Sequence, residues 1–135
     1  MLRKIAVCDD VEVERFVLKR QLMSYFRLTG AKAEIREYVS GESLLADIEE
    51  GYIWPDLIFL DIYMGNLNGM DTARHLREMD VEAPIVFLTA SPDYAVESYE
   101  VEAAGYLLKP AREQQTHAIL QKLLGEKPRR RIAVK

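Results

Sequence analysis

Three carboxylates, one hydroxyl and one ammonium follow short apolar runs of this sequence. The residues are the pair Asp9 and Asp10, then Asp61, Thr89 and Lys109. Carboxylates that share a cleft repel one another, so their charged forms need a cation nearby. A cation bound by a few protein oxygens is typical of Mg²⁺, which keeps water ligands and leaves room for phosphate oxygens. A carboxylate can accept a phosphoryl group, and a lysine can neutralise the phosphoryl oxygens. These residue types therefore indicate phosphoryl transfer with Mg²⁺, if the fold brings them together.

Asp61 alone would be weak support for such a site. An aspartate at the end of a strand commonly caps the turn that follows, and for a single aspartate that interpretation is preferable. Residues 57–60, which precede it, are four apolar residues and predict a strand buried on both faces. Three further strands that end in polar side chains favour a shared site over a simple cap.

The elements that must position these side chains alternate regularly along the chain. Strands are expected at residues 5–8, 33–38, 57–60, 85–88 and 104–108. Helices are expected at residues 11–28, 40–48, 69–79, 92–101 and 113–124. This alternation predicts a single α/β domain, a doubly wound parallel sheet with helices on both faces. For five strands the flavodoxin-like order 2-1-3-4-5 is favoured, which brings the polar strand ends to one edge. Phe16 is expected to supply an apolar contact of the helix at 11–28, and Trp54 is expected to pack where the chain enters the third strand.

Composition limits the class of protein. The 135 residues, 49% hydrophobic and 30% charged, predict one ordinary globular domain. No apolar run approaches the roughly 20 residues of a membrane span, and the N-terminus does not resemble a signal peptide. The single cysteine cannot form an internal disulfide, so a cytoplasmic protein is expected. The net charge of −4 gives the domain as a whole no nucleic-acid-binding character.

The order of these motifs resembles the receiver domain of two-component response regulators, and the similarity covers residues 1–124. The resemblance implies that Asp61 is the phosphoacceptor and that a sensor histidine kinase is the partner that phosphorylates it. It implies that Mg²⁺ is the cofactor. The metal ligands that it implies are Asp9, Asp10, Asp61 and the backbone carbonyl of Tyr63. Beyond its own phosphoryl transfer and autodephosphorylation, no enzyme activity is expected.

The resemblance also assigns the phosphate-binding and switch residues. Thr89 and Tyr106 resemble the switch pair, and Lys109 resembles the phosphate-binding lysine, followed by a cis bond to Pro110. Tyr63 and Ser91 occupy the positions that tune the lifetime of the phosphate. We expect the bulky Tyr63 to shield the acyl phosphate from water.

Two positions depart from the family pattern. Gly65 stands where proline is common, which favours a more mobile loop. Ala111 stands where phenylalanine is common, which leaves less packing after Lys109 and Pro110.

Residues 125–135 begin with linker-like composition and then become basic and strand-like. They are interpreted as a linker and the start of a missing C-terminal output domain, by analogy a LytTR-type DNA-binding domain that regulates transcription. DNA would be contacted only through that domain. The alternatives are a stand-alone receiver, acting as a phosphorelay intermediate or protein-binding switch, and a binding module that is not phosphorylated. The acidic site argues against the last. A phosphatase of similar topology would need Asp-x-Asp, whereas Asp9 and Asp10 are adjacent.

The expected helix at 92–101 carries both aromatic and acidic residues. With the strand at 104–108 and the helix at 113–124, it is expected to form the surface of a homodimer. The alternative is a solvated acidic face with half-buried tyrosines.

Overall fold

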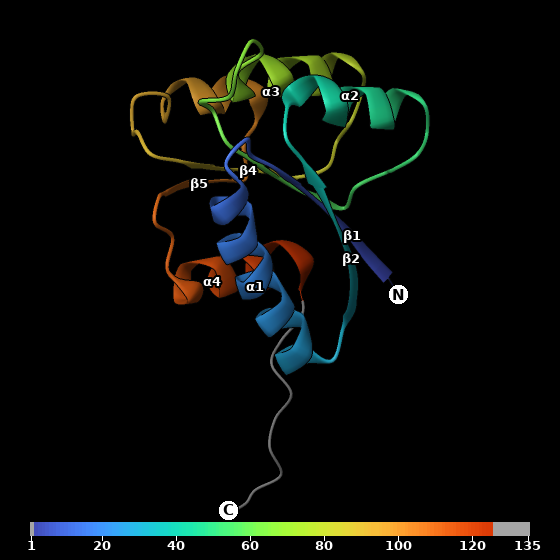
Figure 1. Ribbon diagram of the computed structural model, residues 1–135, viewed down its shortest axis with the longest axis vertical. Helices are drawn as coiled ribbons and strands as arrows, with labels where there is room; N and C mark the ends of the chain where they lie inside the picture. Colours follow the sequence, from blue (N-terminus) through green and yellow to red (C-terminus); the bar gives the residue numbers. More distant parts are fainter. Residues whose placement is uncertain (1, 126–135) are drawn as a thin grey trace, which may run out of the picture.

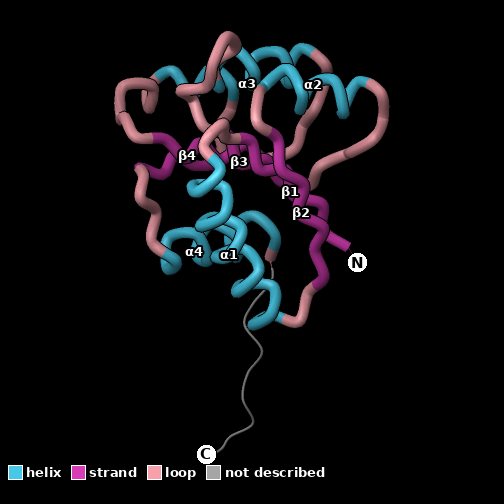
Figure 2. Tube along the Cα trace, viewed as in Figure 1, coloured by secondary structure: helices cyan, strands magenta, loops and turns pink. Residues whose placement is uncertain are grey.

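The computed structural model describes residues 2–125. In this part of the chain, one sheet of five parallel strands runs through the domain in the order β2-β1-β3-β4-β5 (Figures 1 and 2). The strands are β1 (Leu2–Cys8), β2 (Lys32–Tyr38), β3 (Leu57–Leu60), β4 (Ile85–Thr89) and β5 (Gly105–Leu108). The predicted flavodoxin-like order is therefore confirmed.

In the described residues 2–125, four α-helices cover the sheet in two layers. They are α1 (Glu12–Thr29), α2 (Gly41–Glu49), α3 (Gly69–Glu78) and α4 (Glu113–Leu124). Helices α2 and α3 lie on one face of the sheet and α1 and α4 on the other (Figures 1 and 2). Within residues 2–125, every helix is too short or too polar to cross a lipid bilayer.

The buried strands explain why the sheet carries a core on each face. Successive side chains of a strand point to opposite faces, so a central strand needs apolar residues at every position. In β3, Leu57 and Phe59 pack on the side of α1 and α4, whereas Ile58 and Leu60 pack on the side of α2 and α3. All four side chains are buried, which fixes the strand that leads to Asp61.

The structure corrects the prediction of a helix at residues 92–101. A turn is followed there by a short 3₁₀ helix, η1 (Glu97–Val101). The Ser98 hydroxyl donates to the Ala95 carbonyl at 2.6 Å, a local bond that competes with regular α-helical bonding. Glu102 then adopts a left-handed conformation with φ of 54°, which ends the helix.

The apolar contact expected for Phe16 and the packing expected for Trp54 at the start of β3 are both wrong, because the two side chains are mostly exposed. Phe16 lies two positions before Leu18, so it falls on the opposite side of α1 from the buried stripe. It is 56% exposed, and the Arg20 guanidinium lies 5.9 Å from its ring centroid. Trp54 is 62% exposed, whereas the adjacent Ile53 is buried.

The loop between β3 and α3 is fixed by a close backbone contact at Gly69. The Gly69 amide donates to the Ile62 carbonyl at 2.8 Å. A Cβ atom on Gly69 would lie only 2.1 Å from the carbonyl oxygen of Asp61. Only glycine lets these two segments approach so closely, and their contact positions the backbone of Asp61.

We therefore predict that Gly69→Ala destabilises the protein by about 1–3 kcal/mol, because the backbone at Asp61 must move. Gly105→Ala is the matched control. Its Cβ would meet the terminal methyl group of Ile119 at 2.9 Å, and that side chain can rotate away. Urea unfolding measures both variants. Equal losses would contradict the fixed contact at Gly69.

Candidate functional site

Backbone hydrogen bonds carry the sheet one residue beyond the strand ends and so fix the predicted site residues. The Asp9 amide donates to the Tyr38 carbonyl at 3.0 Å, and the Asp61 amide donates to the Cys8 carbonyl at 2.9 Å. The Lys109 amide donates to the Thr89 carbonyl at 2.8 Å. The three polar residues thus start from rigid positions at one edge of the sheet.

Lys109 joins the carboxylates of this edge. Its Nζ lies 2.7 Å from Asp9 Oδ2 and 2.9 Å from Asp61 Oδ2, and it also forms an ion pair with Glu14 Oε1. The Lys109 side chain is 13% exposed, and those of Asp9 and Asp61 are still more buried. Lysine is therefore the local counter-ion of a largely desolvated acidic cluster.

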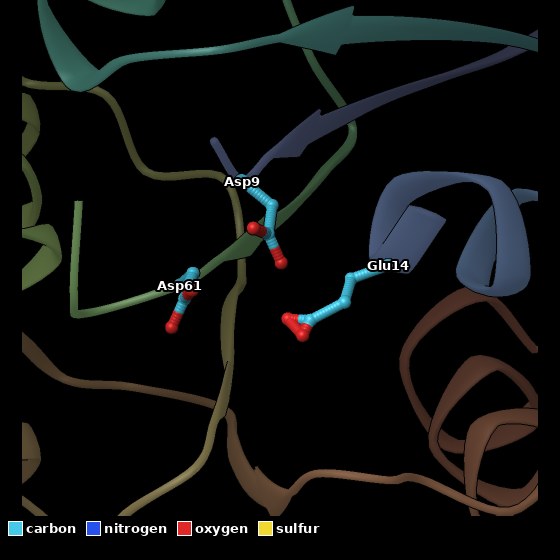
Figure 3. Close-up of side chains that lie close together, drawn as sticks. All are labelled: Asp9, Glu14 and Asp61. Atoms are coloured by element: carbon cyan, nitrogen blue, oxygen red, sulfur yellow. The ribbon is translucent and has the colours of Figure 1, made fainter. Parts of the chain in front are cut away.

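Glu14 was missed by the sequence analysis. Figure 3 shows the carboxylates of Asp9, Glu14 and Asp61 around one space between the strand ends and the start of α1. One ligand atom of each lies within 4.8 Å of the others, a set that could hold a metal ion. Glu14 lies in the first turn of α1, so spacing from a strand end gives no signal for it. Asp10 is exposed and lies outside this cluster.

Asp61 is oriented by its own loop. Its Oδ1 accepts hydrogen bonds from the amides of Ile62 at 2.7 Å and Tyr63 at 3.4 Å, which leaves Oδ2 to Lys109. Burial raises the pKa of Asp61 above its ordinary value despite the hydrogen bond from Lys109, and the nearby Asp9 charge contributes.

Lys109 remains protonated in this setting. Its burial opposes the charged form, but hydrogen bonds to Asp9, Glu14 and Asp61 raise the pKa of Lys109 above its ordinary value. Three carboxylates against one ammonium leave the cluster with two uncompensated negative charges. Such a cleft favours a further cation.

Thr89 has a buried hydroxyl that lacks a partner. The residue is fully buried at the end of β4, and its Oγ1 has no hydrogen bond within the part of the chain that the structure describes. A buried hydroxyl without a partner costs about 1–3 kcal/mol of stability. A hydrogen bond formed to the Thr89 hydroxyl would recover that cost.

The other predicted switch and tuning residues lie beside the cleft, Tyr106 in β5 and Tyr63 and Ser91 in loops. The Tyr106 hydroxyl donates to the Ser91 carbonyl at 2.5 Å and accepts from the Tyr94 amide at 3.3 Å. The Ser91 side chain accepts from the Asp93 amide. Tyr63 is half-exposed, and its ring packs edge-on against that of Tyr94 at a centroid distance of 5.9 Å.

The segment after β5 has the two features expected from the sequence. The Lys109–Pro110 bond is cis. A cavity of about 290 Å³ lies between α1 and this segment and is lined by Pro110 and Ala111, among others. The small side chain of Ala111 thus leaves the space that was expected there.

Comparisons with known proteins agree with this geometry. A family model described as the response regulator receiver domain matches residues 5–121. The sensory transduction protein LytT of Bacillus subtilis is 35% identical over 123 residues, which are 90% of this chain and 48% of LytT. The chain therefore spans about half the length of that curated relative.

Solved structures show the same fold. The response regulatory domain of MrkE from Klebsiella pneumoniae is 29% identical with a TM-score of 0.80, over 90% of this chain and 95% of that one. The response regulator TrrA of Thermotoga maritima, solved in complex with Mg²⁺ and BeF, is 27% identical with a TM-score of 0.76, over 90% of this chain and 98% of that one. Residues 5–121 place this chain in the receiver-domain family of two-component response regulators.

Proposed function

We propose that this receiver is phosphorylated on Asp61 by a sensor histidine kinase in the cytoplasm, with Mg²⁺ as cofactor. The observation that carries the proposal is the contact of Lys109 Nζ with Asp61 Oδ2, beside a buried Thr89 hydroxyl that has no partner among the described residues. A structural aspartate would need neither a desolvated lysine nor an unsatisfied hydroxyl at the same edge.

The cleft has the donor chemistry that Mg²⁺ requires. Carboxylate oxygens are hard ligands, and the cluster of Asp9, Glu14 and Asp61 carries more negative charge than Lys109 compensates. We assign the metal to Asp9, Asp10, Asp61 and the backbone carbonyl of Tyr63. When bound, Mg²⁺ would neutralise charge on the phosphoryl oxygens.

The protein groups perform the transfer as follows. One Asp61 oxygen attacks phosphorus, the bond to the donor nitrogen breaks, and its electron pair stays on that nitrogen. The amides of Ile62 and Tyr63 hold the carboxylate in place. Lys109 stabilises the charge that develops on the phosphoryl oxygens.

The output rests on a population shift. A phosphoryl oxygen gives the Thr89 hydroxyl a partner, and only such a differential contact can move a conformational equilibrium. Tyr106, whose hydroxyl donates a hydrogen bond to the Ser91 carbonyl in this structure, would follow Thr89 inward. The loop and η1 between these two residues would carry the change to a partner.

We assign residues 1–124 to the receiver and 125–135 to a linker and the start of an output domain, although residues 126–135 lie outside the described part. The share of LytT that this chain covers supports a longer protein. Its output would be a DNA-binding, transcription-regulating domain. The alternative is a stand-alone receiver that relays phosphate or binds a protein partner.

The proposed dimer surface consists of residues 92–101, β5 and α4. Tyr99 is 82% exposed, and Val96 is similarly exposed, so this face presents apolar side chains that the fold leaves uncovered. The exposure of Tyr99 supports a partner surface, whereas Tyr94 is half-buried, as the alternative expects.

Asp61→Asn is predicted to abolish labelling by acetyl phosphate, because the amide cannot accept the phosphoryl group. Asp56→Asn is the control, since Asp56 flanks β3 at the opposite end and binds the Lys4 amide. Intact-protein mass spectrometry should show one added phosphoryl group in the wild type and in Asp56→Asn, and none after chelation of Mg²⁺. Labelling of Asp61→Asn would disprove the assignment.

Tyr63→Asn is predicted to speed autodephosphorylation about fivefold, or about 1 kcal/mol of barrier, because the half-exposed ring shields the acyl phosphate from water. Tyr52→Asn, which removes another exposed tyrosine, should leave the rate unchanged. Loss of label is followed over time after the donor is removed. An unchanged or slower rate in Tyr63→Asn would refute the shielding role.

A further inference from the structure

Three carboxylates contact Lys109, and that of Glu14 is the one that extends from a helix. Asp9 and Asp61 follow strands, and each also accepts a backbone hydrogen bond on its Oδ1 atom. Glu14 instead extends from the first turn of α1, and within residues 2–125 its side chain has Lys109 as its only hydrogen-bond partner. The side chain is 36% exposed, against 8% for Asp9 and 6% for Asp61.

Lys109 has no donor left in this arrangement. An ammonium group has three N–H donors, and the contacts with Asp9, Glu14 and Asp61 use all three. A phosphoryl group on Asp61 needs one of those donors. Because Glu14 is the most exposed of the three carboxylates and the least fixed by the backbone, it is the partner that Lys109 loses at the lowest cost.

We propose that Glu14 is a positioning residue that competes with the phosphoryl group for Lys109. In the unphosphorylated chain its carboxylate occupies the donor that a phosphoryl oxygen would use, and its charge repels the incoming group. The Glu14–Lys109 ion pair therefore opposes phosphorylation of Asp61. The inference rests on the proposed function and adds to it a residue that opposes phosphoryl binding.

The competing roles for Glu14 differ in what its removal does. A metal ligand would hold Mg²⁺, so neutralising it would weaken Mg²⁺ binding. An idle surface acid would behave like any other charge near the cleft. A competitor for Lys109 would, when neutralised, release a donor and so strengthen the binding of a phosphoryl analogue.

The test compares Glu14→Gln with Glu12→Gln, which removes the same charge from the same turn of α1 at an exposed position. Beryllofluoride serves as the phosphoryl analogue at saturating Mg²⁺, and its binding is followed by ¹⁹F NMR. Because the Glu14 side chain is partly solvated, we expect Glu14→Gln to bind the analogue about fivefold more tightly than Glu12→Gln. Glu14→Ala, which leaves Lys109 no acceptor at this position, should gain at least as much. Phosphorylation by acetyl phosphate should accelerate in the same order.

Two results would overturn the inference. In one, Glu14→Gln binds beryllofluoride no more tightly than Glu12→Gln. In the other, a titration with Mg²⁺ alone shows that Glu14→Gln loses much more metal affinity than the control, which would make Glu14 a ligand. If the wild type binds no beryllofluoride at all, the proposed function itself is wrong and this inference falls with it.

Discussion

One electrostatic constraint underlies the site: a largely buried lysine must balance several carboxylates at the end of a sheet. Lys109 contacts Asp9, Asp61 and Glu14 in a cleft from which solvent is largely excluded. Removal of either member of such a pair would leave a buried charge without compensation, which is costly. One ammonium cannot neutralise three carboxylates, so the cleft keeps an affinity for added positive charge. This excess of negative charge makes the site unfavourable as structure but favours a bound cation.

The fold supports this unfavourable arrangement of charges because backbone hydrogen bonds hold the site residues in place. The central strands are apolar on both faces, so two cores hold them in register. Hydrogen bonds then continue the ladder past the strands to Asp9, Asp61 and Lys109. On the other side of Asp61, the contact with Gly69 closes the loop. Asp61 is therefore held from both directions, while Tyr63 in its loop and Tyr106 in β5 lie at the margin of the cleft.

Sequence reasoning succeeded where position along a strand decides position in space. Strand order and the meeting of Asp9, Asp61 and Lys109 follow from apolar runs that end in polar residues, because parallel strands bring their carboxyl ends to one edge. Glu14 was not predicted as a site residue because its position depends on the rotation of α1 and on the reach of a flexible side chain. The absence of an α-helix at 92–101 was not predicted because the Ser98 hydroxyl and the left-handed Glu102 outweigh a weak helical pattern. Asp10 remains a predicted ligand that the structure leaves outside the carboxylate cluster.

The central claim is that Asp61 accepts one phosphoryl group and that Lys109 and Thr89 bind its oxygens. The most direct measurement is a crystal structure of this chain with Mg²⁺ and beryllofluoride. The account predicts the analogue on an Asp61 oxygen, with Lys109 Nζ and Thr89 Oγ1 both within hydrogen-bond distance of its fluorides. An analogue bound away from Asp61, or a Thr89 hydroxyl still without a partner beside a bound analogue, would contradict it.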